Sequence, residues 1–544
     1  MKRTSLKKLL VVAAVAIILL LTVGTSVFAS ITSSTNTGSI TITKLEAGVT
    51  AYIYQLTSVN YDYDVDQPYD PQYVWATDLQ SWIGTYYSDY ISEDGSVSSD
   101  FSDVLIDSDS DEVKAFYSKL IAAVKGGDIT NYSSEKDITE NSGDEKSYPV
   151  DENDCTYEIT FSGLSMGTYL IIVENGYRVY TPVVANLVPV YDDGTDEWTL
   201  SDITAESKST NPQVEKFLTY SETTTGSYST TDTIGFTIVA DIPTYLADSL
   251  STTYKIKDTL SDGLTLETDS IVIYGVKGSS ETKLTEGTHY TFDELEEDGF
   301  TVDFDYDEIS SYEQIKIEYT TKLRKDSTLV LGEGGIGNSV TLIYSNNPYS
   351  DDDDNETVMQ EISMEDLATV YTYGIQVKIT DSSDSSVVLD NAEFELSSDT
   401  EGTLYFILVD GIYYKAESTD SGATTTLVSK NGLITIYGLD EGTYYLQETK
   451  APEDYILDTI PQTIVLVDDD KNGLLDTYDE EKGEYVNTDS AIFLATVENK
   501  SGFSLPVTGG YGTVLFVIAG IIVIIIGVVI WKRNAKEEKK NMKC

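Results

Sequence analysis

The chain has 544 residues, of which 92 are acidic and 34 basic, so its formal net charge is −58. A surface this negative repels nucleic acid and anionic lipid, and neither is expected as a partner. The two cysteines and the single histidine also argue against a disulfide-stabilised scaffold and against a cysteine–histidine catalytic pair.

The N-terminal segment has the pattern of an export signal. Four basic residues precede an uncharged run over residues 9–21, and Val27 and Ala29 supply the small residues of a cleavage site. A basic region, a short apolar core and a small-residue exit are typical of a secretory signal peptide. We predict that residues 1–29 are this peptide, cleaved after Ala29, and that the rest of the chain is secreted.

Alternating apolar and polar residues recur along most of the chain and indicate half-buried β-strands. Residues 40–42, 234–238 and 464–466 are clear examples, while helical spacing appears only around residues 78–90 and 111–125. We therefore predict an all-β chain of tandem immunoglobulin-like β-sandwiches, with small helical insertions in the first domain.

Polar linkers divide the chain. One covers residues 206–213, and another is the acidic stretch 350–365, where a solvated linker is favoured over a metal site. After the signal peptide, the predicted divisions are residues 30–208, 209–369, 370–500 and 501–544.

An acidic segment near the end of the third domain has two interpretations. Its spacing is close to that of a calcium-binding loop, although an aspartate stands where glutamate is preferred. The flanking segments read as strands, which favours a solvent-facing acidic hairpin. The candidate ligands are Asp468, Asp470, Asn472, Asp476 and Asp479. A structural calcium is thus the weaker alternative, and no other cofactor is predicted.

The C-terminal segment predicts a single membrane-spanning helix. No charged residue occurs from Gly510 to Trp531, and a cluster of basic residues follows. An apolar run of this length can cross the hydrocarbon core, and the basic cluster places the tail on the cytoplasmic side.

Directly before this helix, Leu505-Pro506-Val507-Thr508-Gly509 resembles the cell-wall sorting signal of Gram-positive surface proteins. The resemblance implies that a sortase cleaves after Thr508 and passes its acyl group to an amine. The partners it implies are sortase and peptidoglycan.

The third domain resembles Cna-B-type domains, through Tyr437-Gly438-Leu439, residues 442–446, Glu448-Thr449-Lys450-Ala451-Pro452 and Asn499-Lys500. The second resembles the middle domain of sortase-assembled backbone pilins. It does so through residues 212–216, Asp258-Thr259-Leu260, Gly337-Asn338 and residues 344–348. The first domain matches loosely, through residues 163–164 and 167–170.

These families imply an isopeptide bond between a lysine and an asparagine inside a domain, and the alternation of the second domain supports it. Lys216, Asp258 and Asn338 each share a strand face with apolar residues. Burial favours a neutral amine and a protonated acid, so Lys216 becomes a nucleophile while Asp258 polarises the Asn338 carbonyl. The alternative is a set of edge residues whose polar tips reach solvent.

In the third domain the acid is expected to be Glu448 and the amide Asn499, both in phase with inward apolar residues. Lys378 is the one lysine between Lys325 and Lys415 and is taken as the amine, although a β-bulge is needed to turn it inward. For the first domain, Lys44, Glu174 and Asn186 form a candidate triad. There an ordinary surface lysine is the default interpretation.

Backbone pilins also carry a lysine near the end of the first domain that accepts the next subunit. Lys208 follows Trp198 at nearly the expected spacing and lies in a polar junction. We expect it to receive Thr508 of another copy, which builds a head-to-tail fibre. A solvated linker lysine is the alternative.

The resulting prediction is a structural shaft subunit of a cell-surface pilus, anchored to the cell wall and not an enzyme. It is expected to support adhesion and colonisation together with ancillary pilins and host surface ligands. The alternatives are a monomeric wall-anchored adhesin, or a tip or base pilin. A secreted hydrolase is disfavoured because its carboxylates show no catalytic pattern.

Overall fold

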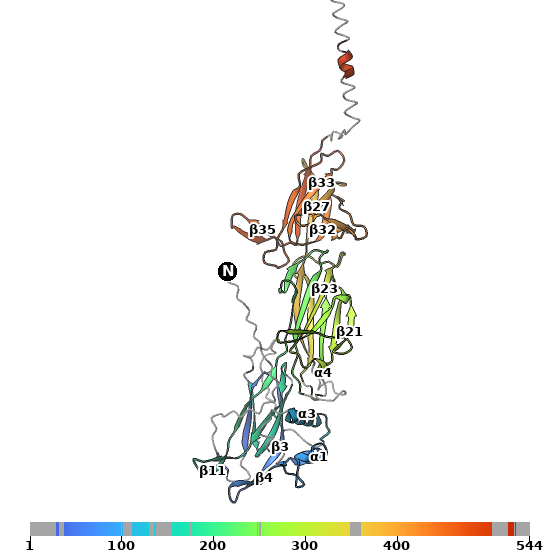
Figure 1. The fold of residues 1–544 in the computed structure, drawn as a ribbon. Helices are drawn as coiled ribbons and strands as arrows, with labels where there is room; N and C mark the ends of the chain where they lie inside the picture. The colour runs from blue at the N-terminus through green and yellow to red at the C-terminus, as the bar shows by residue number, and fades with distance from the viewer. Residues whose placement is uncertain are drawn as a thin grey trace, which may run out of the picture.

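The structure is a computed structural model (Figure 1). It describes residues 29–502, except for residues 32–36, 99–100, 102–110, 130–134, 138–154, 156, 175, 247–248, 250–251, 347 and 349–360, and it also describes residues 521–526 and 528. The predicted signal peptide up to residue 28 and the sorting motif Leu505–Gly509 lie outside these residues. Among the described residues, no helix has the length and apolar character needed to cross a membrane.

Figure 1 shows three β-rich bodies following one another along an elongated molecule. The prediction of an all-β chain with small helical insertions in its first part is confirmed. The helices of that part are α1 (Thr77–Tyr86), η1 (Ser88–Tyr90) and α3 (Asp111–Lys125).

The first body contains two main sheets and a layer of helices. One sheet has the order β4 (Gln67–Trp75), β3 (Thr50–Asp62), β7 (Gly167–Glu174) and β9 (Val183–Leu187), with β5 (Glu135–Asp137) beside β3. The other has the order β12 (Ile203–Glu206), β2 (Gly38–Leu45) and β6 (Tyr157–Leu164). Apolar side chains fill one cluster between these strands and a second cluster under α1 and α3.

Smaller pairings complete the first body. They are β1 (Ala29–Ser30), β10 (Val190–Asp192) and β11 (Glu197–Leu200) in one sheet, and β8 (Val179–Thr181) with β13 (Lys208–Thr210) in another. Because β13 pairs with β8, the strand that contains Lys208 belongs to the sheets of this body.

The second body is a sandwich of two sheets around one core. The first sheet has the order β14 (Val214–Leu218), β16 (Ile234–Asp241), β23 (Gln314–Leu323), β19 (Val272–Lys277) and β20 (Ser280–Lys283), with β18 (Leu264–Leu266) beside β23. The second has the order β15 (Thr225–Ser227), β25 (Glu361–Tyr371), β24 (Ile336–Ser345), β17 (Tyr254–Leu260), β22 (Gly299–Phe304) and β21 (Tyr290–Glu296). Two short helices, η3 (Thr268–Ser270) and α4 (Tyr306–Ile309), connect strands.

The third body is also a sandwich with its own core. One sheet has the order β29 (Tyr405–Val409), β30 (Ile412–Ala416), β32 (Leu433–Leu439), β26 (Tyr373–Asp381) and β37 (Ile492–Asn499). The other has the order β28 (Gly402–Thr403), β27 (Glu393–Ser398), β33 (Gly442–Lys450) and β34 (Gln462–Leu466), with β31 (Leu427–Val428) beside β27. The hairpin of β35 (Asp476–Asp479) and β36 (Glu484–Asn487) projects sideways (Figure 1).

The connection between the second and third bodies is one residue long. Thr372 alone separates β25 from β26, and it is buried, with its hydroxyl donating to the Leu439 carbonyl at 3.0 Å. At the other junction, the hydroxyl of Tyr344 donates to the carbonyl of Tyr177 at 2.6 Å. The hydrogen bond of Thr372 therefore ties the connection to the third body, and that of Tyr344 joins the second body to the first.

Candidate functional site

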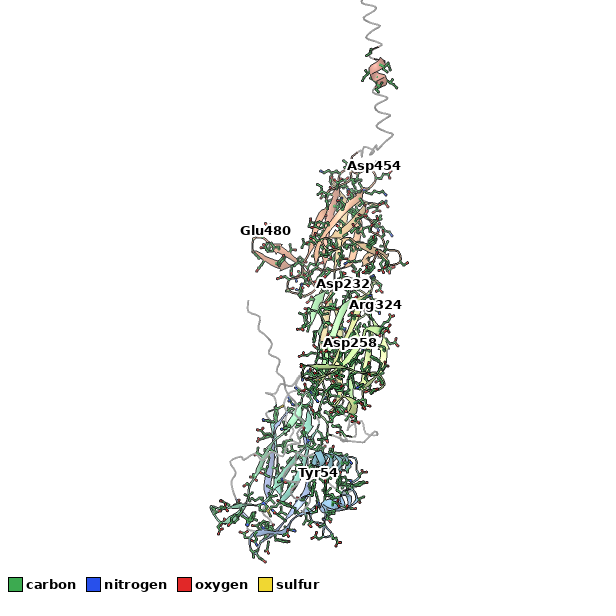
Figure 2. All side chains as sticks on the ribbon, in the orientation of Figure 1. Tyr54, Asp232, Asp258, Arg324, Asp454 and Glu480 are labelled. Atoms are coloured by element: carbon green, nitrogen blue, oxygen red, sulfur yellow. The ribbon has the colours of Figure 1, made fainter. Side chains whose placement is uncertain are left out.

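The middle sandwich buries a lysine, an aspartate and an asparagine in its core. Lys216 comes from β14 in one sheet, whereas Asp258 and Asn338 come from the neighbouring strands β17 and β24 of the other. The register pairs Asp258 with Val340 and Leu260 with Asn338, so the acid and the amide are diagonal neighbours on one face. All three are at most 2% exposed, and Figure 2 shows Asp258 within the second body.

The three side chains are in direct contact. The amine Nζ of Lys216 lies 2.7 Å from Oδ1 of Asn338 and also pairs with the carboxylate of Asp258. A fourth residue, Tyr319 on β23, joins them. Its hydroxyl accepts from Lys216 Nζ at 2.8 Å and from Asn338 Nδ2 at 2.9 Å, and it donates to Asp258 Oδ2 at 2.8 Å.

Burial changes the protonation of this cluster. Loss of water lowers the pKa of Lys216 to about 8, although Asp258 and Asp366 oppose the shift. Burial raises the pKa of Asp258, against the opposing effects of Lys216 and the Tyr319 hydroxyl. The aromatic rings of Phe236 and Tyr319 lie 5.5 Å from Nζ and enclose it. Burial therefore favours the neutral amine and the protonated acid more than water does, because water stabilises the charged forms of both groups.

This arrangement meets the chemical requirements for an amide exchange. A neutral amine is a nucleophile, its target carboxamide is within contact, and the acid can polarise the carbonyl. Because the groups are held in place by the fold, the reaction is intramolecular and gains a large effective concentration. The sequence had indicated Lys216, Asp258 and Asn338 but had missed Tyr319. The alternation of Ile315, Ile317 and Tyr319 along β23 carried the signal that this hydroxyl points inward.

The third sandwich brings together two of its three predicted residues. Glu448 and Asn499 are buried, and Asn499 Nδ2 donates to Glu448 Oε1 at 2.7 Å. The prediction of Lys378 as their amine is corrected, because its side chain is exposed and its Nζ lies 3.5 Å from the Ser385 carbonyl.

The reason lies in the strand that carries Lys378. The irregular pairing of β26 falls between Tyr373 and Gly374, and the regular alternation that follows turns Val377 and Ile379 inward. Lys378 lies between those two residues and therefore points outward.

The candidate triad of the first body is not assembled either. A register shift between Ile42 and Leu45, with a positive φ of 62° at Lys44, turns this lysine to the surface. There it pairs with Glu206 at 2.6 Å. Glu174 instead pairs with Lys125 of α3, and Asn186 accepts a hydrogen bond from Thr168 at 2.8 Å. Lys44 is the surface lysine that the default interpretation expected.

Lys208 is exposed and opens β13, opposite Thr181 of β8. Its main chain is thus held in a short strand and not in the free linker that the sequence suggested, while its side chain is accessible. A macromolecule approaching the junction of the first two bodies can reach its amine.

The acidic segment of the third body is organised by hydrogen bonds. Carboxylate oxygens of Asp468, Asp470 and Asp476 lie within 4.8 Å of one another. The buried Asp468 accepts from the backbone nitrogens of Asn472 and Gly473 and from the hydroxyl of Tyr373. Asp479 lies at the end of β35, where it accepts from backbone nitrogens of the hairpin turn. Asp468 and Asp479 thus each accept hydrogen bonds from the backbone around them.

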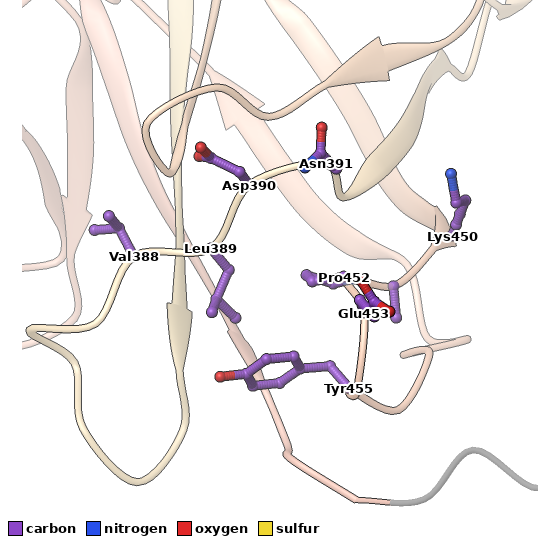
Figure 3. Close-up of a pocket in the computed structure, with 9 residues that line it drawn as sticks. Val388, Leu389, Asp390, Asn391, Lys450, Pro452, Glu453 and Tyr455 are labelled. Carbon is purple, nitrogen blue, oxygen red and sulfur yellow. The ribbon is translucent and has the colours of Figure 1, made fainter.

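A surface pocket of about 560 Å³ lies at the far end of the third body (Figure 3). Its lining includes Asp390, Lys450, Pro452 and Tyr455. Gly502, the last residue described before the sorting motif, donates to the Asp454 carbonyl at 3.1 Å beside it. The pocket is therefore next to the point where the chain leaves the sandwich.

Comparisons with known proteins agree with this architecture. Residues 374–481 match the family model of the SpaA prealbumin-like fold domain. The trypsin-resistant surface T6 protein of Streptococcus pyogenes is 24% identical over 323 residues, which is 55% of this chain and 56% of that protein. The match thus spans about half the length of that relative.

A solved structure of the T6 backbone pilin of Streptococcus pyogenes, described as modular with three domains, is similar with a TM-score of 0.57. It is 18% identical, and the similarity covers 87% of this chain and 100% of that one. The resemblance to backbone pilins that the sequence predicted is confirmed by these comparisons. The chain therefore has the fold of a modular backbone pilin.

Proposed function

We propose that this chain is the shaft-forming subunit of a pilus on a Gram-positive cell surface, and that its middle sandwich is covalently closed by an isopeptide bond between Lys216 and Asn338. The observation that carries the proposal is the contact of a buried amine with a buried carboxamide, 2.7 Å apart and beside an acid. The pilin-like fold supports the same assignment.

The bond forms without an external enzyme. The neutral amine of Lys216 attacks Cγ of Asn338, the Nζ–Cγ bond forms and the Cγ–Nδ2 bond breaks. One proton moves from Nζ to Nδ2, so ammonia leaves. The protein is the substrate of this single event and has no turnover, which fits a structural role.

The mass of the folded protein tests the cross-link. Loss of ammonia lowers the intact mass by about 17 Da for one bond. We expect this loss in the protein and not in Asn338→Ala, which lacks the carboxamide. A peptide that links Lys216 to Asn338 is expected in a protease digest, and a protein at its full sequence mass would refute the bond.

The polymer is proposed to form head to tail. A sortase cleaves after Thr508 and joins its carbonyl to the amine of Lys208 on the next copy, and the last subunit is transferred to peptidoglycan. Ancillary pilins and host ligands then meet the shaft at its ends or along its surface. The exposed side chain of Lys208 at a junction between bodies supports its use as the acceptor.

Immunoblots of cell-wall extracts test the polymer. We expect a ladder of high-mass species that disappears in Lys208→Ala. Lys283→Ala, which removes an exposed lysine on β20, serves as the matched control and retains the ladder. A single discrete band from cells with an active sortase would instead indicate the wall-anchored monomer.

A further inference from the structure

Tyr319 touches every member of the buried cluster. Its hydroxyl oxygen accepts from Lys216 Nζ at 2.8 Å and from Asn338 Nδ2 at 2.9 Å, and its proton goes to Asp258 Oδ2 at 2.8 Å. Among the contacts of the described residues, it is this hydroxyl that links the nucleophile, the acid and the leaving nitrogen. Nδ2 is the atom that must gain a proton before ammonia can leave.

We infer that Tyr319 is a catalytic residue of the cross-linking reaction, acting as the proton relay between Asp258 and the departing nitrogen of Asn338. The inference rests on the proposed cross-link and adds a residue and a step to it. The hydroxyl is placed for this task by geometry, since it is within hydrogen-bond distance of both the proton source and the proton acceptor.

The relay balances in protons and charge. The amine of Lys216 adds to Cγ of Asn338. Asp258, protonated at the start, passes its proton to the Tyr319 oxygen while the Tyr319 hydroxyl proton moves to Nδ2, and the resulting carboxylate takes one proton from Nζ. The Cγ–Nδ2 bond then breaks, ammonia leaves with the third proton, and both Asp258 and Tyr319 end in their starting forms.

The surroundings of Tyr319 favour a relay over a free base. The residue is 2% exposed, and its ring stacks on Phe236 and meets Phe300 edge-on. Burial and the adjacent Asp258 raise its pKa well above the usual value, so the phenolate is disfavoured. The proton from Asp258 must therefore reach the Tyr319 oxygen at the same time as the hydroxyl proton leaves for Nδ2.

The test compares rates of bond formation in freshly folded protein, followed by intact mass. Tyr319→Phe keeps the ring and its stacking and removes only the hydroxyl. General acid–base catalysis contributes on the order of 10²-fold or more, so we expect closure about 100-fold slower. The matched control is Tyr254→Phe, because Tyr254 is equally buried on β17 but its hydroxyl donates to the Ala240 carbonyl at 3.2 Å. It is expected to close at the unaltered rate.

A second variant separates proton transfer from packing. Fluorinated tyrosine at position 319 keeps the hydroxyl and nearly the same shape but makes the phenol more acidic. A relay predicts that the rate of bond formation changes with the acidity of the phenol. It also predicts that the solvent deuterium isotope effect on this rate is smaller in Tyr319→Phe. A hydroxyl that only supports the structure predicts neither.

The outcomes distinguish the two claims. If the unaltered protein closes and Tyr319→Phe closes equally fast, or if fluorination leaves the rate unchanged, the relay is wrong and the cross-link stands. If the unaltered protein keeps its full sequence mass, both are wrong.

Discussion

Lys216 lies in a core from which water is excluded, and its amine is therefore both reactive and costly to bury. Its neighbours limit the cost, because Asp258, Asn338 and Tyr319 all contact Nζ. In the proposed bond the amine becomes an amide nitrogen, which no longer titrates. The proposed reaction would thus remove the penalty for burying a charge as it joins the strands.

A variant that cannot close should reveal this penalty through pH. In Asn338→Ala, Lys216 keeps a folded-state pKa of about 8, compared with 10.5 in the unfolded chain. Between these values the unfolded state binds the extra proton, so the free energy of unfolding rises with pH, by about 3 kcal/mol over the full interval. Asp258, whose pKa is raised by burial, acts in the opposite direction as the pH rises above its usual value of 3.8.

Urea unfolding at pH 7.5, 9 and 10.5 measures this rise. The double variant Lys216→Met/Asn338→Ala retains the other titrating groups and lacks the amine, so its profile supplies the reference. Parallel profiles for the two variants would contradict the lowered pKa of Lys216.

The outcome for individual lysines shows how far sequence reasoning reaches. Lys216 was placed correctly because β14 alternates without interruption. The directions in which the side chains of Lys44 and Lys378 point depend on whether the strand is irregular at one position. The packing of neighbouring strands decides where such an irregularity occurs. Tyr319 was missed because a tyrosine among inward aliphatic residues gives no sign of which polar groups it will meet.

At the scale of elements, the third sandwich holds an acid–amide pair that no amine of the described residues contacts. Asn499 Oδ1 is buried and has no hydrogen-bond partner among the described residues. Strand β26 runs parallel to β37, with Ile379 beside Val497 and Asp381 beside Asn499. Among the buried residues on the face of β26 that includes Val377, Ile379 is therefore the one that lies nearest to the pair along the register.

Ile379→Lys is expected to supply the missing amine and create a cross-link to Asn499. A buried amine beside Glu448 has the same chemistry as the amine of the middle sandwich. The intact mass of the variant should therefore fall below its own sequence mass by about 17 Da more than that of the unaltered protein does. Val377→Lys, two residues further from Asn499, is the control and should not close. A folded Ile379→Lys protein without the added loss would contradict this placement.

The strands and helices themselves were largely predictable. The two helical patches correspond to α1 with η1 and to α3, because apolar residues three and four apart bury one face against β3 and β7. Strand β13 was not predicted. Its residues are polar, and its pairing with β8 is a long-range contact that local alternation does not reveal.

At the scale of the whole molecule, the second and third bodies meet in a packed junction. Lys415 is buried there and contacts Ser229 and Glu401, and the hydroxyl of Thr230 donates to the Lys415 carbonyl at 2.6 Å. Lys325 and Asp420 form an ion pair across the same boundary. With a one-residue connection, these contacts favour a fixed angle between the bodies.

Gly438 permits this close approach. It has a φ of +79°, and a Cβ at this position would lie 2.5 Å from the side chain of Thr230. Gly438→Ala should therefore loosen the junction, and small-angle scattering should show a wider range of molecular lengths. Gly402→Ala is the matched control, since Gly402 has a φ of +73° with no heavy atom within 4 Å of a Cβ. Equal scattering from both variants would mean that Thr230 does not hold the angle.

The proposed cross-link does not include the last strand of its sandwich. It joins β14 to Asn338 on β24, whereas the chain continues to the third body from β25, which pairs with β24 over its length. Tension along the proposed shaft would therefore pass from Asn338 to β25 through hydrogen bonds. Single-molecule pulling should release roughly 30 residues, about 10 nm, in one step. In Asn338→Ala the whole sandwich should unravel, with a several-fold longer step.

Each subunit would then carry a short length of spare chain stored beside a link that cannot open. A sudden pulling force would be absorbed by strands that detach from the sheet and later refold, while the covalent bonds between the cell and the tip of the fibre stay intact. A fibre built in this way would lengthen before it breaks, and the length that it gains would increase with the number of subunits it contains.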